Sequence, residues 1–242
     1  HNGTVQTPDI VILAAGLGSR LGRPIPKCLT PLAGGTTIME QQVAAVRQVF
    51  GTDARVTAVV GFKFELVMEE FPDLTYVYNE SYDRTNTAKS LLKALRLSGP
   101  GGVLWLNGDL VFEPEVMHRA QSAMAAQTSF TCVNTAEVGD EEIKYTVDGS
   151  GRIKELSKTV ENGVGEAMGI NYVTPQDKGA LIRRLDEVGD QDYFERGIEL
   201  AIAHDGLTVI PVDASDLFTV EVDFAEDLSR ADAWLSRPSP AG

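Results

Sequence analysis

Three glycines and a group of basic residues follow the first apolar run of the chain. Gly16, Gly18 and Gly22 come directly after that run, and Arg20 and Lys27 lie in the same segment. Because glycine has no Cβ, backbone amides at these positions can approach phosphate oxygens closely. Amide donors and two fixed cations together suit a triphosphate, which carries several negative charges. The segment therefore predicts a phosphate-binding loop, which we favour over a plain strand-to-helix turn with solvated basic residues.

A dinucleotide is the competing ligand for such a loop. A dinucleotide-binding turn has the pattern G-x-G-x-x-G at the start of a helix, with a ribose-binding carboxylate about 20 residues further on. Here Leu21 takes the third glycine position, Pro24 and Pro26 interrupt any helix, and we assign no ribose carboxylate. The loop therefore favours a triphosphate, and an NAD(P)-dependent oxidoreductase is the weaker alternative.

Three carboxylates that are far apart along the chain are candidates for a metal site. Asp109 ends a buried run, at the place where α/β folds bind their ligands. Glu221 and Asp223 lie two residues apart, so an extended segment directs both side chains to one side. Since Mg²⁺ favours carboxylate, phosphate and water oxygens, we predict Mg²⁺ as the cofactor and these three residues as its ligands. The structural alternatives are a turn residue at Asp109 and a helix cap at Asp223.

Strand-like and helix-like segments alternate over the first half of the chain, and they must position these residues. Apolar runs suited to buried strands occur at 9–15, 55–60, 74–78 and 102–109. Helical spacing of apolar residues covers 36–50 and 85–97. This alternation implies βαβ units and a mainly parallel sheet, in which the ends of neighbouring strands meet at one edge.

After Asp109 the regular alternation of strand-like and helix-like segments ends. Residues 129–134 predict a strand, and 143–156 predict a hairpin that turns at Asp-Gly-Ser-Gly. A helical pair follows at about 175–188 and 192–204.

The last segment predicts late strands and a closing helix, with Asp223 as its cap and Phe224 at the start of its apolar face. The fold class is therefore α/β: a Rossmann-like, mainly parallel mixed sheet flanked by helices, with a small inserted β-hairpin region. We expect a single domain over residues 1–242, with flexible ends at 1–7 and 237–242.

Composition excludes several classes of function. Of the 242 residues, 43% are hydrophobic and 23% charged, and no apolar run is long enough to cross a bilayer. The net charge of −14 repels nucleic acid and acidic membrane surfaces, so any phosphate must bind in a local basic pocket. Cys28 and Cys132 are too few for a disulfide framework, which makes the cytoplasm the expected location.

The segment from Leu13 to Leu29 resembles a known family signature. Residues 13–21 and 26–29 match LAAGxGxRL…PKxL of the nucleotidyltransferases in the sugar-nucleotide pyrophosphorylase-like superfamily. Asp109 and the later acidic pair fall in the order that this superfamily uses. The resemblance implies a nucleotide-diphospho-sugar transferase fold and a set of nucleotide-binding residues: Leu13, Ala14, Ala15, Gly16, Gly18, Ser19, Arg20, Lys27, Asn86, Ser90 and Asn107.

A second segment narrows the resemblance to one branch. Residues 85–91, TNTAKSL, are similar to the TNN..SL segment of bacterial choline-phosphate and phosphonate cytidylyltransferases. Asn86 and Ser90 match that pattern, while Thr87 stands in place of its second asparagine. The resemblance therefore implies CTP as the nucleotide, although Asn86 also suits a plain helix cap. A sugar-1-phosphate nucleotidyltransferase that uses UTP or dTTP is the alternative in the same class.

The acceptor pocket is expected to follow the hairpin. The resemblance implies that Lys158, Glu166 and Gly169 contact a phosphate or phosphonate acceptor such as choline phosphate or aminoethylphosphonate. A solvated surface lysine is the alternative for Lys158. Further pocket candidates are Tyr82, Arg84, Tyr145 and Tyr172.

The resemblance also implies the reaction. An acceptor oxygen attacks the α-phosphorus of the nucleotide directly and pyrophosphate leaves, with Arg20, Lys27 and Lys158 as the catalytic cations. The expected partners are CTP or another NTP and a small phosphorylated or phosphonate acceptor, with no nucleic acid and no membrane. A sensor that binds nucleotide without turnover and a homo-oligomer both stay open.

Overall fold

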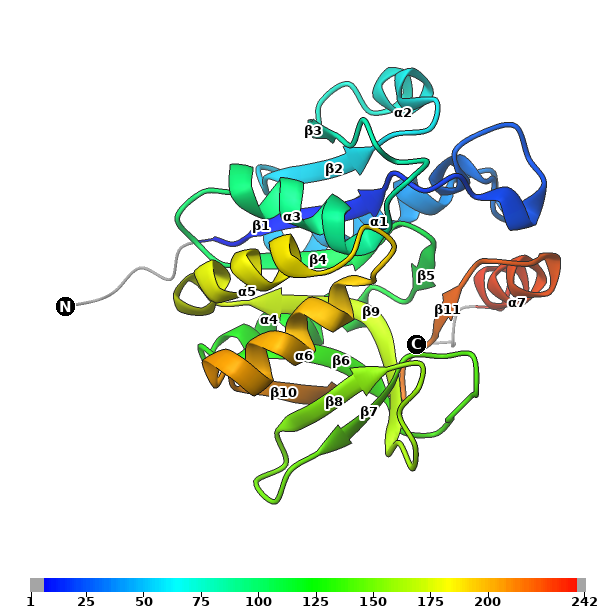
Figure 1. Ribbon diagram of the computed structural model, residues 1–242. Helices are drawn as coiled ribbons and strands as arrows, with labels where there is room; N and C mark the ends of the chain where they lie inside the picture. The colour runs from blue at the N-terminus through cyan, green and yellow to red at the C-terminus, as the bar shows by residue number, and fades with distance from the viewer. Residues whose placement is uncertain (1–6, 239–242) are drawn as a thin grey trace.

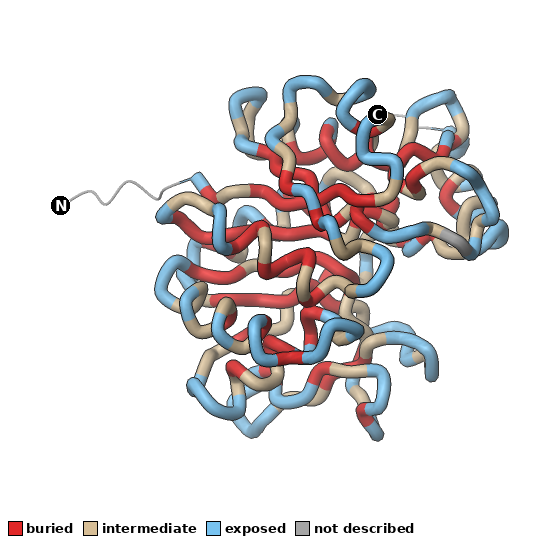
Figure 2. Tube along the Cα trace, turned by 45° about the horizontal axis from the view of Figure 1, so that its top comes forward, coloured by how far each residue is buried: buried red, intermediate tan, exposed pale blue. Residues whose placement is uncertain are grey.

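The centre of the fold is the strand that precedes the glycine-rich loop. The computed structural model describes residues 7–238, with one large sheet covered by helices (Figure 1). β1 (Asp9–Ala14) lies between β2 (Val56–Val60) and β4 (Val103–Asn107), and β3 (Thr75–Tyr78) lies beside β2. All of these pairs are parallel. Figure 2 shows β1, β2 and β4 in the buried interior, whereas only Val77 of the edge strand β3 is buried.

The other half of the sheet contains one reversed strand. β9 (Gly165–Val173) pairs antiparallel with β4 and with β6 (Ser129–Asn134), and β10 (Val209–Asp213) pairs parallel with β6. The strand order is β10-β6-β9-β4-β1-β2-β3, and every strand in this row except β9 runs in the same direction. The predicted α/β class with a mainly parallel mixed sheet is confirmed.

Alternation along β1 divides the core into two layers. Ile10 and Ile12 belong to one cluster of buried side chains, and Val11 and Leu13 belong to another, because successive strand residues point to opposite faces. Residues of α1 (Ile38–Phe50), α2 (Phe64–Glu70) and α4 (Glu115–Met124) join the first cluster. Residues of α3 (Thr87–Leu97), α5 (Pro175–Glu187) and α6 (Phe194–Asp205) join the second.

Local sequence explains where the helices begin. Thr37 precedes α1 and forms a capping box with Glu40: each side chain accepts a hydrogen bond from the other residue's backbone N–H. Thr174 caps α5, and Pro175 occupies its first position, where a missing N–H costs nothing.

Two small units extend from the main sheet. The predicted hairpin is present as β7 (Lys144–Val147) and β8 (Ile153–Ser157), and β7 joins the large sheet through β9. β5 (Leu110–Phe112) pairs antiparallel with β11 (Thr219–Glu221), which leads into α7 (Ala225–Leu235). This second unit places the segment after β11 beside Asp109, where the Val222 N–H donates to the Asp109 carbonyl oxygen at 2.8 Å.

The prediction that Asp223 caps the closing helix is wrong. The residue at the cap position of α7 is Phe224, and the Asp227 carboxylate accepts hydrogen bonds from the N–H groups of Asp223 and Phe224 at 3.0 and 2.9 Å. The Asp227 carboxylate therefore binds the backbone N–H groups at the start of α7, and the Asp223 side chain takes no part in capping the helix. Phe224 does not start the apolar face either, since 51% of it is exposed. Helices α2 and α4 were not predicted from the sequence.

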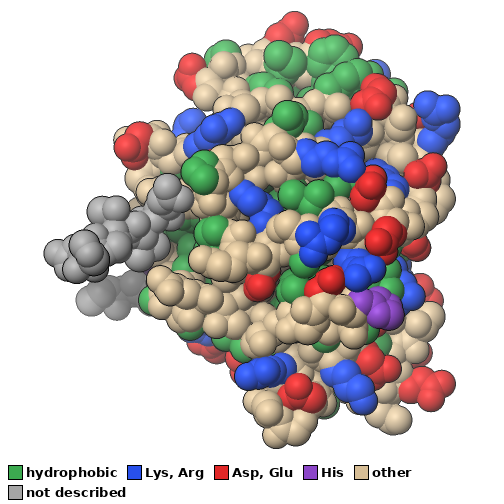
Figure 3. Space-filling model, turned by 60° about the vertical axis from the view of Figure 1, so that its left-hand side comes forward, with side chains coloured by type: hydrophobic (Ala, Val, Ile, Leu, Met, Phe, Trp, Pro, Cys, Tyr) green, Lys and Arg blue, Asp and Glu red, His purple; other side chains and the backbone are tan. Residues whose placement is uncertain are grey.

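Basic and acidic side chains are mixed on the outer helices. Figure 3 shows Lys and Arg side chains interspersed with Asp and Glu on one face. Ion pairs between Arg96 and Asp186 (2.9 Å) and between Arg184 and Asp205 (2.7 Å) link α3, α5 and α6. Among the described residues, no helix is long and apolar enough to span a membrane. Of the expected flexible ends, residues 1–6 and 239–242 lie outside the described residues.

The turn after β4 tolerates only glycine at its first position. A Cβ on Gly108 would lie 2.5 Å from the carbonyl oxygen of Leu13. We expect Gly108→Ala to lower the free energy of unfolding by about 1–3 kcal/mol, because the backbone of β1 cannot move aside. Urea unfolding measures this loss. Gly149→Ala in the hairpin turn is the control, since nothing lies within 4 Å of the added Cβ, and an equal loss there would contradict the explanation.

Candidate active site

The site lies where β1 and β4 end side by side. Leu13 is paired with Asn107, and the N–H of Gly108 donates to the Leu13 carbonyl at 2.8 Å. Beyond this point β1 continues into the glycine-rich loop and β4 into the turn that carries Asp109. Ligands of α/β folds bind at the carboxyl ends of such strands.

A buried glutamine holds the turn in place. The Gln42 side chain on α1 is fully buried, and its Nε2 donates to the carbonyl oxygens of Asn107 and Leu110, both at 2.9 Å. These two bonds bracket Asp109 and so limit the positions its backbone can take. Sequence reasoning missed this residue, although a glutamine among the apolar residues of 36–50 is an indication that a buried polar partner exists.

The loop brings its second cation inward through a close glycine contact. Gly18 has a φ of +61°, and a Cβ there would lie 3.0 Å from the Cβ of Lys27. Lys27 opens the short helix η2 (Lys27–Leu29), and Arg20 lies in η1 (Ser19–Leu21). The loop therefore folds back on itself, with Gly18 packed against the base of Lys27.

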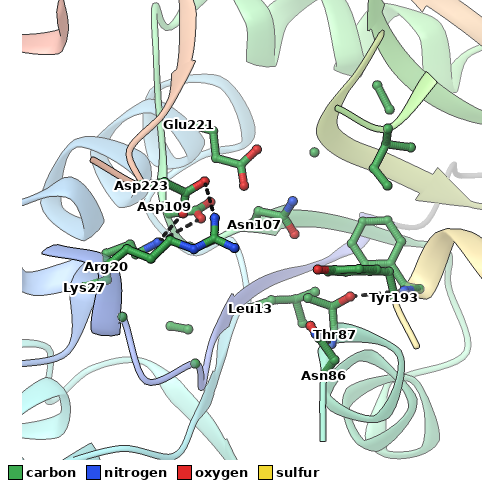
Figure 4. Close-up of a pocket in the computed structure, with 18 of the residues that line it drawn as sticks. Leu13, Arg20, Lys27, Asn86, Thr87, Asn107, Asp109, Tyr193, Glu221 and Asp223 are labelled. Carbon is green, nitrogen blue, oxygen red and sulfur yellow. Dashed lines mark hydrogen bonds and ion pairs between the residues drawn. The ribbon is translucent and has the colours of Figure 1, made fainter. Parts of the chain in front are cut away.

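The two cations meet a carboxylate from the other end of the chain. Lys27 Nζ lies 2.6 Å from Asp223 Oδ1 and 3.5 Å from Asp109 Oδ2. Arg20 Nη1 lies 3.7 Å from Asp223 Oδ2, and its guanidinium carbon lies 5.7 Å from the centre of the Phe224 ring. Figure 4 shows the charged side chains converging from separate elements: Arg20, Lys27, Asp109 and Asp223.

Three carboxylates crowd one position and suit a divalent metal. One oxygen from each of Asp109, Glu221 and Asp223 lies within 4.8 Å of the others. Asp109 Oδ1 is buried with no hydrogen-bond partner among residues 7–238. Three carboxylate oxygens, one of which makes no hydrogen bond, are the kind of ligand that Mg²⁺ prefers. The residues therefore fit the predicted ion.

The pKa values show how strongly these groups interact. Burial raises the pKa of Asp109, and the Lys27 ammonium opposes that rise. The charge of Asp109, followed by burial, raises the pKa of Glu221 to about 9. Burial alone would lower the pKa of Lys27, but Asp109 and Asp223 raise it, so the lysine stays protonated.

The charged cluster opens into a cavity of about 810 Å³. Asn86 lies at its other side, where its Oδ1 accepts a hydrogen bond from the Thr87 N–H at 2.8 Å and caps α3 (Figure 4). The cap interpretation of Asn86 is thus correct, and the residue also faces the cavity. Most of the residues predicted for the site line this cavity: Leu13, Ala14, Gly16, Gly18, Arg20, Lys27, Asn86, Asn107, Asp109, Lys158, Gly169, Glu221 and Asp223.

The Ser19 side chain lies outside the described part of the chain, and three other predicted site residues lie outside the cavity lining. Ala15 is buried, and Ser90 is buried where its Oγ accepts a hydrogen bond from Asn79 Nδ2 at 3.0 Å. The Glu166 carboxylate accepts from the N–H of Gly139 instead of facing the cavity. The four tyrosine and arginine candidates also lie outside the lining: Tyr82, Arg84, Tyr145 and Tyr172.

A buried lysine builds one cavity wall. The Lys144 ammonium donates to the carbonyl oxygens of Asp140 at 2.9 Å and Lys158 at 2.6 Å, which ties the 135–143 loop to the end of β8. Lys158 thereby reaches the cavity, where its Nζ lies 5.1 Å from the centre of the Tyr193 ring. Neither Lys144 nor Tyr193 was found from sequence, because burial of a hairpin lysine and helix packing depend on distant segments.

Fold and site together have the organisation of a nucleotidyltransferase. The chain belongs to the MobA-like NTP transferase domain family, whose model matches residues 10–168. The superfamily resemblance inferred from the signature is thus confirmed.

Curated relatives extend beyond this chain. The CMP-5'-(3-aminopropyl)phosphonate synthase of Streptomyces rubellomurinus is 29% identical over an alignment that covers 98% of this chain and 41% of that protein. The bifunctional protein GlmU of Thiobacillus denitrificans is 32% identical over 74% of this chain and 35% of its own length. The chain thus spans about two fifths or less of these relatives.

Solved structures share the fold at low identity. The inositol-1-phosphate CTP transferase of T. maritima superposes with a TM-score of 0.73, at 15% identity, over 97% of this chain and 98% of that one. The CTP:phosphocholine cytidylyltransferase of Streptococcus pneumoniae superposes with a TM-score of 0.72, at 15% identity, over 95% of this chain and 100% of that one. At this identity the likeness establishes the fold alone.

Repulsion among the carboxylates predicts a pH effect on stability without metal. The pKa of Glu221 is about 9 in the folded chain against an ordinary value of 4.5, so folding takes up a proton between these pH values. The free energy of unfolding of the metal-free protein should therefore fall as pH rises from about 5 to about 9. We expect Glu221→Gln to reduce this fall and Mg²⁺ to reduce it in the unmodified protein, as measured by urea unfolding with chelator or Mg²⁺. The exposed Glu65→Gln is the control, and identical pH profiles for all three proteins would refute the repulsion.

Proposed function

We propose that this chain transfers CMP from CTP to a small phosphate or phosphonate acceptor, with Mg²⁺, and releases pyrophosphate. The observation that carries the proposal is the convergence of Lys27 with Asp109 and Asp223 at the carboxyl end of the parallel strands. Similarity along 98% of the chain to a CMP-phosphonate synthase supports cytidylyl transfer in particular.

The cationic side of the cavity suits the triphosphate. The glycine-rich loop offers backbone amides, and Arg20 and Lys27 offer charges that can hold phosphate oxygens. Asp109, Glu221 and Asp223 would hold Mg²⁺, which neutralises charge on the phosphates when it is bound. The Lys27 ammonium, which is paired with two carboxylates in this structure, would contact the phosphate oxygens of the nucleotide when it is bound.

The chemistry needs no general base. An acceptor phosphate or phosphonate oxygen is ionised at neutral pH, so it attacks the α-phosphorus of CTP as it stands and the bond to pyrophosphate breaks. Catalysis then consists of aligning the two anions and stabilising the charge that builds up between them. Lys158, on the opposite cavity wall, is the residue we assign to the acceptor anion.

We assign the nucleobase of CTP to the side of the cavity that holds Asn86 and Thr87. With the Asn86 Oδ1 used in capping, its NH₂ group remains a donor for an oxygen or nitrogen on a pyrimidine edge. UTP or dTTP with a sugar 1-phosphate is the second candidate, because the match to the NTP transferase family does not by itself select the nucleotide.

A nucleotide panel separates these two candidates. Pyrophosphate release is measured with CTP, UTP, dTTP, ATP and GTP, each with Mg²⁺ and with phosphonate, choline phosphate and sugar 1-phosphate acceptors. We expect CTP to give the highest kcat/KM by at least about 10-fold, a difference that one or two hydrogen bonds to the base supply. A preference for UTP or dTTP would overturn the cytidylyl assignment and leave the nucleotidyltransferase assignment in place.

Removal of the central cation tests the assigned machinery. We expect Lys27→Ala to lower kcat with CTP and acceptor by at least about 100-fold, the usual cost of a lost charge-stabilising group. Asp109→Ala should lose a similar factor. The exposed Lys154→Ala is the matched control and should retain full activity. Circular dichroism verifies folding of each variant, and near-normal turnover in folded Lys27→Ala would refute the role.

A further inference from the structure

A buried lysine behind the cavity wall has its charge surrounded by backbone carbonyl groups. Lys144 on β7 is only 7% exposed and does not itself line the cavity. Its ammonium donates to four carbonyl oxygens, at 2.6 and 2.9 Å to two of them and at 3.4 and 3.5 Å to the others: Lys158, Asp140, Glu142 and Gly139. Buried lysines are rare unless they are paired, so a charge spent on main-chain groups needs an explanation.

A glutamate on the neighbouring strand holds the same loop. Lys144 of β7 and Glu166 of β9 are direct partners in the sheet, so both side chains start from one place. The Glu166 carboxylate accepts a hydrogen bond from the Gly139 N–H, and the Lys144 ammonium donates to the Gly139 carbonyl. Glu166 thus contacts the 139–142 segment and not the cavity. Both charges of this pair are used to fix that segment.

The two segments that Lys144 joins carry side chains of the cavity wall. Glu141 and Glu142 line the cavity from the loop, and Lys158 lines it directly after β8. Lys158 is the cation that we assign to the acceptor anion. Lys144 therefore determines where the acceptor side of the cavity lies, although it makes no contact with the cavity itself.

The nucleotide side of the cavity is held by other contacts. Gln42 of α1 binds the carbonyl groups on either side of Asp109, at the carboxyl end of β4. The four carbonyl groups bound by Lys144 belong instead to residues 139–142 and to the residue after β8. The two sides are thus positioned by separate sets of hydrogen bonds, and losing one set should affect one substrate.

We infer that Lys144 is a positioning residue for the acceptor: its ammonium fixes the Lys158 main chain against residues 139–142, which holds the Lys158 side chain in place to bind the acceptor anion. This inference rests on the proposed function and extends it to a residue outside the cavity. Hydrogen bonds from a charged donor are stronger than neutral ones, and removing the donor leaves buried carbonyl oxygens without a partner. A neutral side chain of similar length would therefore let the two segments separate.

Kinetics with both substrates test this role. Lys144→Met removes the charge and keeps most of the volume. The acceptors are 2-aminoethylphosphonate, choline phosphate and glucose 1-phosphate, and the one with the highest turnover is varied at saturating CTP and Mg²⁺. We expect KM for this acceptor to rise at least about 10-fold, while KM for CTP stays within about 3-fold of the unmodified protein. Lys154→Met, on an exposed position of β8, is the matched control and should change neither value. An equal rise in both KM values would show a general structural role and overturn the inference.

A double-mutant cycle tests whether Lys144 acts through Lys158. Lys158→Ala should raise KM for the acceptor by itself. Lys144→Met added to Lys158→Ala should raise it by less than about 2-fold further, because the group that Lys144 positions is already absent. Two effects that multiply in full would mean that Lys144 acts by another route and would overturn the inference.

Limited proteolysis tests the anchoring without turnover. A glutamate-specific protease can cleave after the exposed Glu141 and Glu142 when the loop opens. We expect cleavage there to be at least about 10-fold faster in Lys144→Met than in the unmodified protein, and a larger increase than at any other glutamate. Equal cleavage of the two proteins would overturn the inference alone. No pyrophosphate release from CTP with any acceptor would instead overturn the proposed function, and the cleavage result would still decide whether Lys144 anchors the loop.

Discussion

The organisation of the site depends on the attraction between one lysine and two carboxylates. Lys27 lies 2.6 Å from Asp223 and 3.5 Å from Asp109, and the three groups come from a loop, a strand end and the segment before the last helix. Without the lysine, the negative charges of Asp109, Glu221 and Asp223 would repel one another in a partly buried position. The same repulsion is the electrostatic condition that a divalent ion, as proposed above, would relieve.

The scaffold around this cluster is built from close backbone contacts. Gly108 lets the turn after β4 pass over Leu13, and Gln42 bonds the carbonyl groups on either side of Asp109. Gly169 has a φ of +78°, and a Cβ there would lie 2.7 Å from Asn107 Nδ2. β9 therefore crosses directly against the pocket floor. These contacts leave little freedom at the strand ends, which is the condition for stabilising charge without reorganisation.

The cavity joins two parts of the chain with different chemistry. The first part contributes the glycine-rich loop and the strand ends, which the family model covers as far as residue 168. The second contributes Tyr193 and the start of α6, with the Phe194 ring and the buried carboxylate of Glu195. The two walls of the cavity thus come from different parts of the chain, and only the first lies within the segment that the family model matches.

The sequence by itself determined the class of fold and the glycines and cations that line the loop side of the cavity. The spacing of apolar residues predicted the strands and helices of the parallel core. Glycines, prolines and cations in one short segment predicted the loop. Both signals depend on residues that are neighbours along the chain. Only the tertiary structure decided which distant groups meet. It assigned the cap of α7 to Asp227 and left Asp223 for Lys27, buried Ser90 against Asn79, and turned Glu166 to Gly139. It also placed Gln42, Lys144 and Glu195, because burial of a polar side chain depends on the surfaces that fold over it.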